Sequence, residues 1–254
     1  MAEHEERLAC ATWNIHRARG RDGALRPGRV AEALVRELAP GAEVLALTEA
    51  DTDRPPHAGL LDLAALEAAT GLRSAHGAAR LRWGPRSHGF LGILVLLAPS
   101  LTVTSAQVLD LPGYCHRGAV ALDLRRGQRE VRVVATHLSL GQALRAVQMR
   151  AIGQYLRRAR PMQTILLGDL NEWRPWGGLA LSRRLVGVHL AGPARPTFPA
   201  VRPILPLDRI LTTPGGCIRR ARVLSSPALR MASDHLPLAG DVVLAPTQTA
   251  HRGR

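Results

Sequence analysis

The sequence predicts a single α/β domain, and three observations support this prediction. The chain has 254 residues, of which 46% are hydrophobic, enough for one large core. Short apolar runs of strand length recur along it, and several end in a polar residue at a turn. Between some of these runs, longer segments carry apolar residues at helical spacing. We expect one domain over residues 8–244, with flexible termini at 1–7 and 245–254.

The predicted strands are apolar runs bounded by Gly, Pro and other turn residues. In chain order they are expected at 8–15, 43–48, 89–97, 101–109, 118–124, 131–136, 165–167, 207–211, 221–224 and 238–244. A proline-rich stretch at 193–206 interrupts this order. We interpret it as a surface loop and not as a linker, because a strand follows at once.

Helices are predicted where apolar residues return every three to four positions. They are expected at 29–38, 60–69, 142–159 and, as a short helix, near 178–184. Pro40-Gly41 closes the first helix and Gly71 the second. In the longest helix, the spacing predicts one face toward the core and the other toward water. The predicted core face comprises Leu144, Val147, Ile152 and Leu156, and the predicted water face comprises Arg145, Arg150, Arg157 and Arg158.

The chain is strongly basic, with a net charge of +14. Such a charge usually suggests nucleic acid or an acidic surface as partner. All 34 basic residues are arginine, however, and they are scattered along the chain, which indicates a biased genome more than a selected binding face. The absence of lysine excludes Schiff-base and P-loop lysine chemistry.

Cys10, Cys115 and Cys217 lie far apart and offer no zinc-binding spacing. We expect buried free thiols in a reducing compartment. The N-terminus is charged and shows no signal peptide, and the longest apolar stretch, 90–101, is too short to span a bilayer. The predicted localisation is therefore cytoplasmic.

Candidate site residues lie at strand ends, most clearly in residues 165–173. Ile165, Leu166 and Leu167 read as a buried strand that ends at Gly168, and Asp169 and Asn171 follow. Gly, Asp and Asn are also ordinary turn residues, so an Asx turn is the alternative explanation. Other predicted strands deliver polar residues in the same way, which favours a shared site. These residues are Asn14, Glu49, His137 and Asp208.

Six short motifs resemble the endonuclease/exonuclease/phosphatase superfamily in order and approximate spacing. They are Thr12-Trp-Asn-Ile, Leu47-Thr-Glu49, Thr136-His-Leu138, Gly168-Asp-Leu-Asn171, Leu207-Asp-Arg-Ile210 and Ser233-Asp-His-Leu-Pro237. The resemblance covers residues 8–244 and implies a DNase I-like four-layer α/β/β/α sandwich, two packed β-sheets flanked by helices. The short loops look most like small bacterial members. Thr48 stands where the family usually has Gln, and Leu170 replaces a common Phe.

The residue types fit the hydrolysis of a phosphodiester, which needs a hard cation, a positioned water and a proton acceptor. Glu49 is the expected metal anchor, Asn14 can add a neutral oxygen, and Asp234 is a further candidate that would act directly or through water. We expect Mg²⁺ or Mn²⁺, because carboxylate and amide oxygens suit these ions.

The resemblance also implies catalytic roles. His235 is the expected general base, and Asp208 would orient its ring. Asp169 would orient or deprotonate the attacking water, and Asn171 would donate to a phosphate oxygen. His137 is either a second donor to developing charge or a supporting residue.

Several neighbouring residues have open roles. Four of them fit a phosphate contact and a plain solvated position equally well: His16, Arg17, Asp22 and Arg117. Trp173 and Trp176 offer a surface for stacking on a base, but packing is favoured because aromatic residues are so scarce.

The sequence thus predicts a monomeric, metal-dependent phosphoesterase that prefers phosphodiesters. Nucleic acid is the first expected substrate, and a lipid or small-molecule phosphoester is the second. A non-catalytic binding protein on the same fold is the rival interpretation. The intact polar set argues against that rival, because a degenerate site should have lost one or more of these residues.

Overall fold

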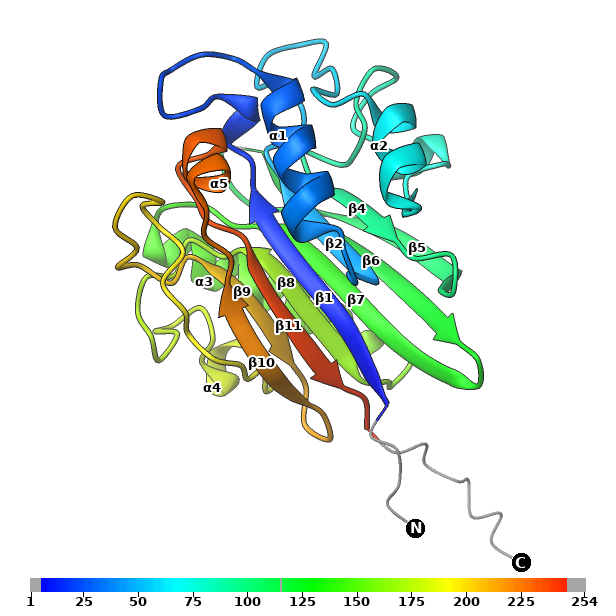
Figure 1. The fold of residues 1–254 in the computed structure, drawn as a ribbon. Coiled ribbons are helices and arrows are strands. Elements are labelled where there is room, and N and C mark those ends of the chain that lie inside the picture. The colour runs from blue at the N-terminus through cyan, green and yellow to red at the C-terminus, as the bar shows by residue number, and fades with distance from the viewer. Residues whose placement is uncertain (1–5, 115, 246–254) are drawn as a thin grey trace, which may run out of the picture.

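Two β-sheets pack face to face between outer helices, which makes four layers (Figure 1). The structure is a computed structural model that describes residues 6–114 and 116–245. The six-stranded sheet has the order β10-β11-β1-β2-β4-β3, and the five-stranded sheet has the order β5-β6-β7-β8-β9. This arrangement confirms the α/β/β/α sandwich. Of the termini predicted to be flexible, 1–7 and 245–254, residues 1–5 and 246–254 lie outside the described residues, whereas Arg7 already belongs to β1.

Most strands lie on the predicted apolar runs, but β3 was not predicted and β10 begins before the predicted 221–224. The six-stranded sheet contains β1 (Arg7–Asn14), β2 (Val44–Thr48), β3 (Arg73–Ser74), β4 (Leu94–Leu97), β10 (Cys217–Val223) and β11 (Leu238–Val243). The five-stranded sheet contains β5 (Thr102–Leu111), β6 (Arg117–Arg126), β7 (Arg129–His137), β8 (Thr164–Asp169) and β9 (Asp208–Thr212).

Parallel strand pairs bring polar residues to one edge of the sandwich. β1 runs parallel to β2, with Asn14 beside Thr48, and β7 runs parallel to β8, with His137 beside Asp169. β9 is antiparallel to β8 and begins beside the end of that strand, so Asp208 pairs with Asp169. Because parallel strands end at the same edge of a sheet, their terminal side chains meet there.

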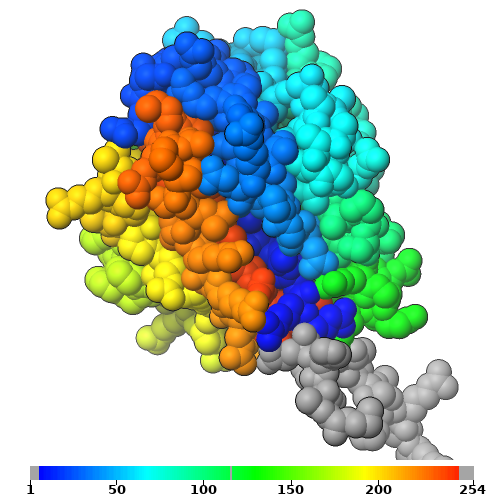
Figure 2. All heavy atoms as spheres, viewed as in Figure 1, coloured from blue at the N-terminus to red at the C-terminus, as the bar shows by residue number. Residues whose placement is uncertain are grey.

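Helices cover the outer faces of both sheets. The six-stranded sheet carries α1 (Pro27–Ala33), which continues as a π-helical turn (Leu34–Leu38), together with α2 (Leu63–Thr70) and α5 (Pro227–Ala232). Figure 2 shows this covered face, with α1 in blue, α2 in cyan and α5 in orange. The five-stranded sheet carries α3 (Gln142–Arg158) and α4 (Arg183–Val186). Within the described residues, no helix is long and apolar enough to cross a membrane.

Three apolar clusters fill the spaces between the four layers. The central one joins the two sheets and includes Leu8, Val95 and Leu122. The outer clusters join each sheet to its helices, through Leu34 on one side and Met149 on the other. The core is thus built mainly from aliphatic side chains, as the scarcity of aromatic residues predicts.

The predicted faces of the longest helix were wrong at two positions. Val147 is 50% exposed, whereas Arg145 is buried, with its guanidinium 3.3 Å from a carboxylate oxygen of the buried Glu172. Gln148 is also buried, and its side-chain oxygen accepts a hydrogen bond from the backbone N–H of Ser139. Polar side chains on this face therefore hold neighbouring loops, a role that hydrophobic spacing does not reveal.

Other expectations need correction in detail. The predicted strand 89–97 begins as a tight turn, so β4 starts only at Leu94. The short α4 begins at Arg183, at the end of the predicted 178–184, and continues to Val186. Trp173 and Trp176 are 47% and 75% exposed and not packed inside, because they lie on the irregular segment before α4. Cys217, at the start of an exposed strand, is itself exposed, Cys10 is buried as expected, and Cys115 lies outside the described residues.

Candidate active site

Five predicted site residues meet at the edge where the parallel strands end. Asn14, His137 and Asp169 end β1, β7 and β8, Asp208 begins β9, and Glu49 directly follows β2. The two sheets contact each other through β1 and β8, among other pairs, so both contribute to one cluster. Four of the five residues are buried, and only Glu49 is partly open to solvent. The protein thus gathers ionisable groups at a place where they are largely shielded from water.

Asp169 is the centre of the cluster. Its Oδ2 atom accepts a hydrogen bond from Asn14 Nδ2 at 2.9 Å, and its Oδ1 atom accepts one from the Asn171 backbone N–H at 2.9 Å. The Nε2 atoms of His137 and His235 lie 3.4 and 3.9 Å from Asp169 Oδ2.

The Asx-turn alternative also describes this segment. Asn171 has a φ of 50°, a left-handed conformation that Asn tolerates better than most residues, and its backbone bonds the Asp169 side chain. Its side-chain amide donates to the Leu138 carbonyl at 2.9 Å. The turn therefore positions Asp169 and also anchors the loop after β8 to the end of β7.

Asp208 and His235 form a buried hydrogen-bonded pair. His235 Nδ1 lies 2.8 Å from Asp208 Oδ2, which also accepts a hydrogen bond from the Thr197 hydroxyl at 2.7 Å. The Phe198 ring packs against the imidazole at a centroid distance of 4.8 Å. Because the carboxylate accepts from Nδ1–H, the Nε2 atom of His235 is the one turned toward Asp169.

Burial and charge shift the pKa values of three groups in this cluster, His235, Asp169 and His137. Burial alone would lower the pKa of His235, but the adjacent Asp208 raises it to about 10. Burial raises the pKa of Asp169 well above its usual range, Asp208 adds to this effect, and His235 opposes it. Burial, followed by Arg117, lowers the pKa of His137 well below its usual value. The two histidines therefore favour opposite protonation states at neutral pH.

Glu49 offers an incompletely satisfied carboxylate. Arg17 Nη1 forms an ion pair with Glu49 Oε2 at 2.9 Å. No group of the described residues donates a hydrogen bond to this buried oxygen. Glu49 Oε1 lies 4.0 Å from His137 Nε2. A carboxylate oxygen in this state is suited to a small hard cation.

Glu49 and Asn14 supply the oxygen atoms that could hold a cation at this edge. Across residues 6–114 and 116–245, no group of three His, Cys, Asp or Glu side chains is arranged to hold a metal. Mg²⁺ keeps several waters and is commonly bound through one or two carboxylates plus substrate phosphate. Asn14 Oδ1 accepts a hydrogen bond from the His16 backbone N–H, which leaves a second lone pair. Asp234 is 39% exposed and lies 3.6 Å from His16 Nδ1.

The loop after β1 places Arg17 in the site, whereas Asp22 on the same loop forms an ion pair with Arg29 of α1. Arg17 reaches Glu49 and also Asp53, at 3.0 Å. Asp22 instead pairs with Arg29 at 2.6 Å. Arg117, at the start of β6, places Nη1 3.1 Å from His137 Nδ1. Of the four residues with open roles, Arg17 and Arg117 thus contact the site with their side chains. His16 contacts Asn14 and Asp234, and Asp22 pairs with Arg29 instead.

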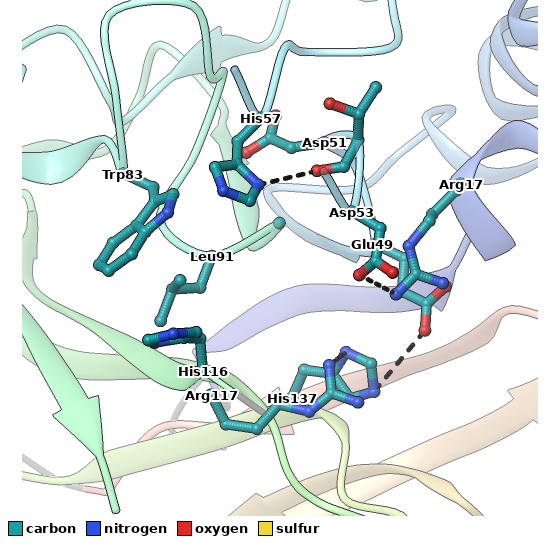
Figure 3. Close-up of a pocket in the computed structure, with 12 residues that line it drawn as sticks. Arg17, Glu49, Asp51, Asp53, His57, Trp83, Leu91, His116, Arg117 and His137 are labelled. Carbon is teal, nitrogen blue, oxygen red and sulfur yellow. Dashed lines mark hydrogen bonds and ion pairs between the residues drawn. The ribbon is translucent and has the colours of Figure 1, made fainter. Parts of the chain in front are cut away.

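A pocket of about 400 Å³ opens on the Glu49 side of the cluster (Figure 3). Glu49, His137, Arg17 and Arg117 form its boundary with the cluster, and Asp169 and His235 do not line it. A substrate that places phosphate near Glu49 and His137 therefore has enclosed space beside it.

Sequence reasoning did not identify the polar support beneath Asp169 and Asn171. Glu172 is fully buried and bonds Arg174 and Arg145. Arg209, also buried, donates to the backbone carbonyls of Glu172 and Arg174 at 3.3 and 2.8 Å. The residue type does not distinguish a buried arginine from a surface arginine, and this chain is rich in arginine. The one sequence feature that could have indicated the support is the position of Glu172, directly after the Gly168-Asp-Leu-Asn171 motif.

Many solved structures resemble this fold, and three of them illustrate the likeness. An endonuclease/exonuclease/phosphatase from Beutenbergia cavernae is 23% identical (TM-score 0.67, covering 94% of this chain and 72% of that one). Humanized D. rerio TDP2 is 18% identical (TM-score 0.67, covering 93% and 98%). A mannosyl-6-phosphatase from Bacteroides thetaiotaomicron is 15% identical (TM-score 0.69, covering 93% and 100%). At these identities the likeness shows the fold alone.

The sequence itself gives the family. No curated protein matches the chain. The profile of the Endonuclease/Exonuclease/phosphatase family, however, matches residues 11–235, which span the motifs from β1 to His235. The chain belongs to the endonuclease/exonuclease/phosphatase family.

Proposed function

We propose that the protein is a divalent-metal-dependent hydrolase of phosphodiester bonds. The observation that carries this proposal is the convergence of Asp169, Asn14, His137 and His235 at one sheet edge, beside the Glu49 carboxylate. Family members mostly hydrolyse phosphoester bonds. Among the structural relatives, the Bacteroides protein is named as a phosphatase.

In the proposed reaction, a water oxygen forms a bond to phosphorus while the bond from phosphorus to the leaving oxygen breaks. The leaving oxygen departs with the electron pair of that bond and takes a proton from solvent. Asp169 accepts the water proton, because it is the carboxylate on which the other groups of the cluster converge. Asn14 and the Asn171 backbone N–H hold its two oxygens in place. The raised pKa of Asp169 makes it a stronger proton acceptor than an ordinary aspartate.

The histidines stabilise charge in this proposal. His235, whose pKa Asp208 holds high against the effect of burial, donates a hydrogen bond from Nε2 to a phosphate oxygen. This role replaces the general-base role expected from the sequence, because an imidazolium cannot accept a proton. His137 donates from its own Nε2 atom on the Glu49 side.

Glu49 and Asn14 are the residues that would hold the metal, and Asp234 is the reserve candidate. When bound, Mg²⁺ or Mn²⁺ neutralises negative charge on phosphate oxygens. Arg17 must then share Glu49 with the cation, and its second partner, Asp53, can retain the guanidinium. Nucleic acid remains the first substrate class proposed from the sequence, and a lipid or small-molecule phosphoester the second.

The test is hydrolysis of bis-p-nitrophenyl phosphate and of p-nitrophenyl phosphate with Mg²⁺, Mn²⁺ or EDTA. We expect the diester to be cleaved faster, activity to be lost in EDTA, and Asp169→Asn to lower kcat by about 10²-fold or more. Glu49→Gln should mainly raise the metal concentration required. Exposed Glu130→Gln is the matched control and should leave the metal titration unchanged. Full activity in excess chelator would exclude the metal mechanism.

A further inference from the structure

The pocket beside Glu49 has two chemically different halves. Figure 3 shows Arg17, Glu49 and Asp53 grouped on one side, and Trp83 and Leu91 on the other. The charged half adjoins the phosphate position proposed above. The other half carries a large aromatic ring and an aliphatic side chain, which the hydrolysis of phosphate does not itself require.

Trp83 is held in a fixed orientation. Phe90 contacts it edge-on at a centroid distance of 5.8 Å and an angle of 79°, and His57 does so at 6.3 Å and 71°. His116 lies tilted against it at 5.6 Å. Trp83 stays half-buried while it lines the pocket. A ring positioned in this way before binding gives a stacking surface at little cost in side-chain entropy.

Leu91 reaches the pocket from an unfavourable backbone conformation. Phe90 and Ile93 exchange two backbone hydrogen bonds of 3.0 Å, which closes a two-residue turn over Leu91 and Gly92. Both residues have positive φ, 52° and 78°. Turns of this kind favour Asn-Gly, and a leucine in the first position is strained. Strain of this kind concentrates at ligand sites, and here it places an apolar side chain on the pocket wall.

The charges of the pocket do not suit a long polyanion. Its lining includes two arginines, Arg17 and Arg117, and three carboxylates, Glu49, Asp51 and Asp53. The volume of about 400 Å³ lies at the lower end of the range for small-molecule sites. These features fit a compact ligand with one phosphate at the charged half and an uncharged group at the other.

We propose that the pocket binds a planar aromatic ring of the substrate, a nucleobase or an aryl group, against Trp83 and Leu91. The substrate class is then a small phosphoester that carries one such ring. The placement of its phosphate near Glu49 and His137 rests on the proposed function. Ring recognition by Trp83 and Leu91 is a separate property of this chain.

The test compares two probes that differ by the ring. Binding of adenosine 5′-monophosphate and ribose 5-phosphate to the Asp169→Asn protein is measured by calorimetry in Mg²⁺. We expect adenosine 5′-monophosphate to bind about tenfold tighter than ribose 5-phosphate, or more. Stacking of one base on one aromatic side chain contributes a difference in affinity of this size. Trp83→Leu should remove this preference. Trp176→Leu, which changes a tryptophan that is 75% exposed and outside the pocket, should keep it.

Leu91→Asn is a second variant, chosen because it should change the pocket without disturbing the fold. Asn suits the turn, so the chain should fold, as its unfolding temperature will show, while the pocket loses its aliphatic wall. We expect a severalfold smaller preference for the ringed probe. Equal binding of the two probes by Asp169→Asn, or an unchanged preference in both pocket variants, would overturn the proposal, and tighter binding of ribose 5-phosphate would indicate a sugar site.

The two proposals fail in different ways. A clear ring preference in a protein that hydrolyses no phosphoester would contradict the proposed function and leave the ring site intact. Metal-dependent hydrolysis with no ring preference would contradict the ring site alone.

Discussion

Arg117 decides which nitrogen of His137 carries the proton. A guanidinium has only donors, so His137 Nδ1, 3.1 Å from Arg117 Nη1, must accept and the proton of the neutral ring must lie on Nε2. That N–H points toward Asp169 and Glu49, whose nearest oxygens lie 3.4 and 4.0 Å away. A residue outside the family motifs thus keeps the Nε2–H donor of His137 directed toward Asp169 and Glu49, where the proposed function places the phosphate.

We predict that Arg117→Met lowers kcat about tenfold, the effect of misplacing one hydrogen bond to a charged group. The measurement pairs kinetics with ¹⁵N NMR of the His137 ring. In the wild type Nε2 should carry the proton, and in Arg117→Met the two tautomers should mix. The exposed Arg86→Met is the control and should change neither. A pure Nε2–H tautomer in Arg117→Met would contradict the assignment.

His76 joins two elements through a neutral imidazole. Its Nδ1 atom lies 2.7 Å from the Leu81 carbonyl oxygen, and its Nε2 atom accepts a hydrogen bond of 3.1 Å from the backbone N–H of Val95 in β4. Protonation at Nε2 would break the second bond. Burial accordingly lowers the pKa of His76 in the folded state.

This arrangement predicts an acid-sensitive contribution to stability. Because the folded pKa lies below the unfolded value near 6.5, the unfolded state takes up the proton first. The contribution of His76 is complete above about pH 6.5 and falls by up to about 1.4 kcal/mol per pH unit below it, until the folded pKa is reached. Urea unfolding between pH 7.5 and 5.5 should show a shallower loss in His76→Gln than in wild type. Exposed His189→Gln should keep the wild-type slope, and a wild-type slope in His76→Gln would refute the prediction.

The elements that could be predicted are those whose evidence is local. β7 and β8 follow apolar runs, and the helix 142–159 was placed to within one residue as α3. Such runs and helical spacing depend only on neighbours in the chain. The strand 89–97 failed at its start, because its first residues form a turn with a leucine where Asn is usual, and α5 is too short to show a period.

The site could be located from sequence, but its internal chemistry could not. The motifs name Asp169, Asp208 and His235, and the structure brings them together. The protonation preferences depend on burial and on distances between residues far apart in the chain, which no spacing encodes. Arg145 illustrates the same limit, because its burial depends on Glu172, 27 positions away.

The basic charge of the whole molecule is distributed, and much of it is already paired. Arg132 pairs with Asp123 at 2.6 Å, Arg160 with Glu130 at 2.7 Å and Arg29 with Asp22 at 2.6 Å. On the loop beside Asn14, Arg17 bonds acidic side chains and Arg19 donates to the Gly23 carbonyl at 2.6 Å. Ion pairing therefore lowers the number of arginines whose charge can bind a phosphate backbone.

We accordingly predict weak, sequence-independent binding to duplex DNA, despite the net charge of +14. The logarithm of the binding constant should fall with the logarithm of salt concentration with a shallow slope, about −2 to −4, equivalent to two to four neutralised phosphates. The measurement is titration of a labelled duplex with Asp169→Asn, from low to physiological salt. Tight binding with a slope steeper than about −6 would mean that the arginines form a real DNA-binding face. Nuclease activity on duplex DNA would then explain the net charge better than activity on a small ring-bearing phosphoester.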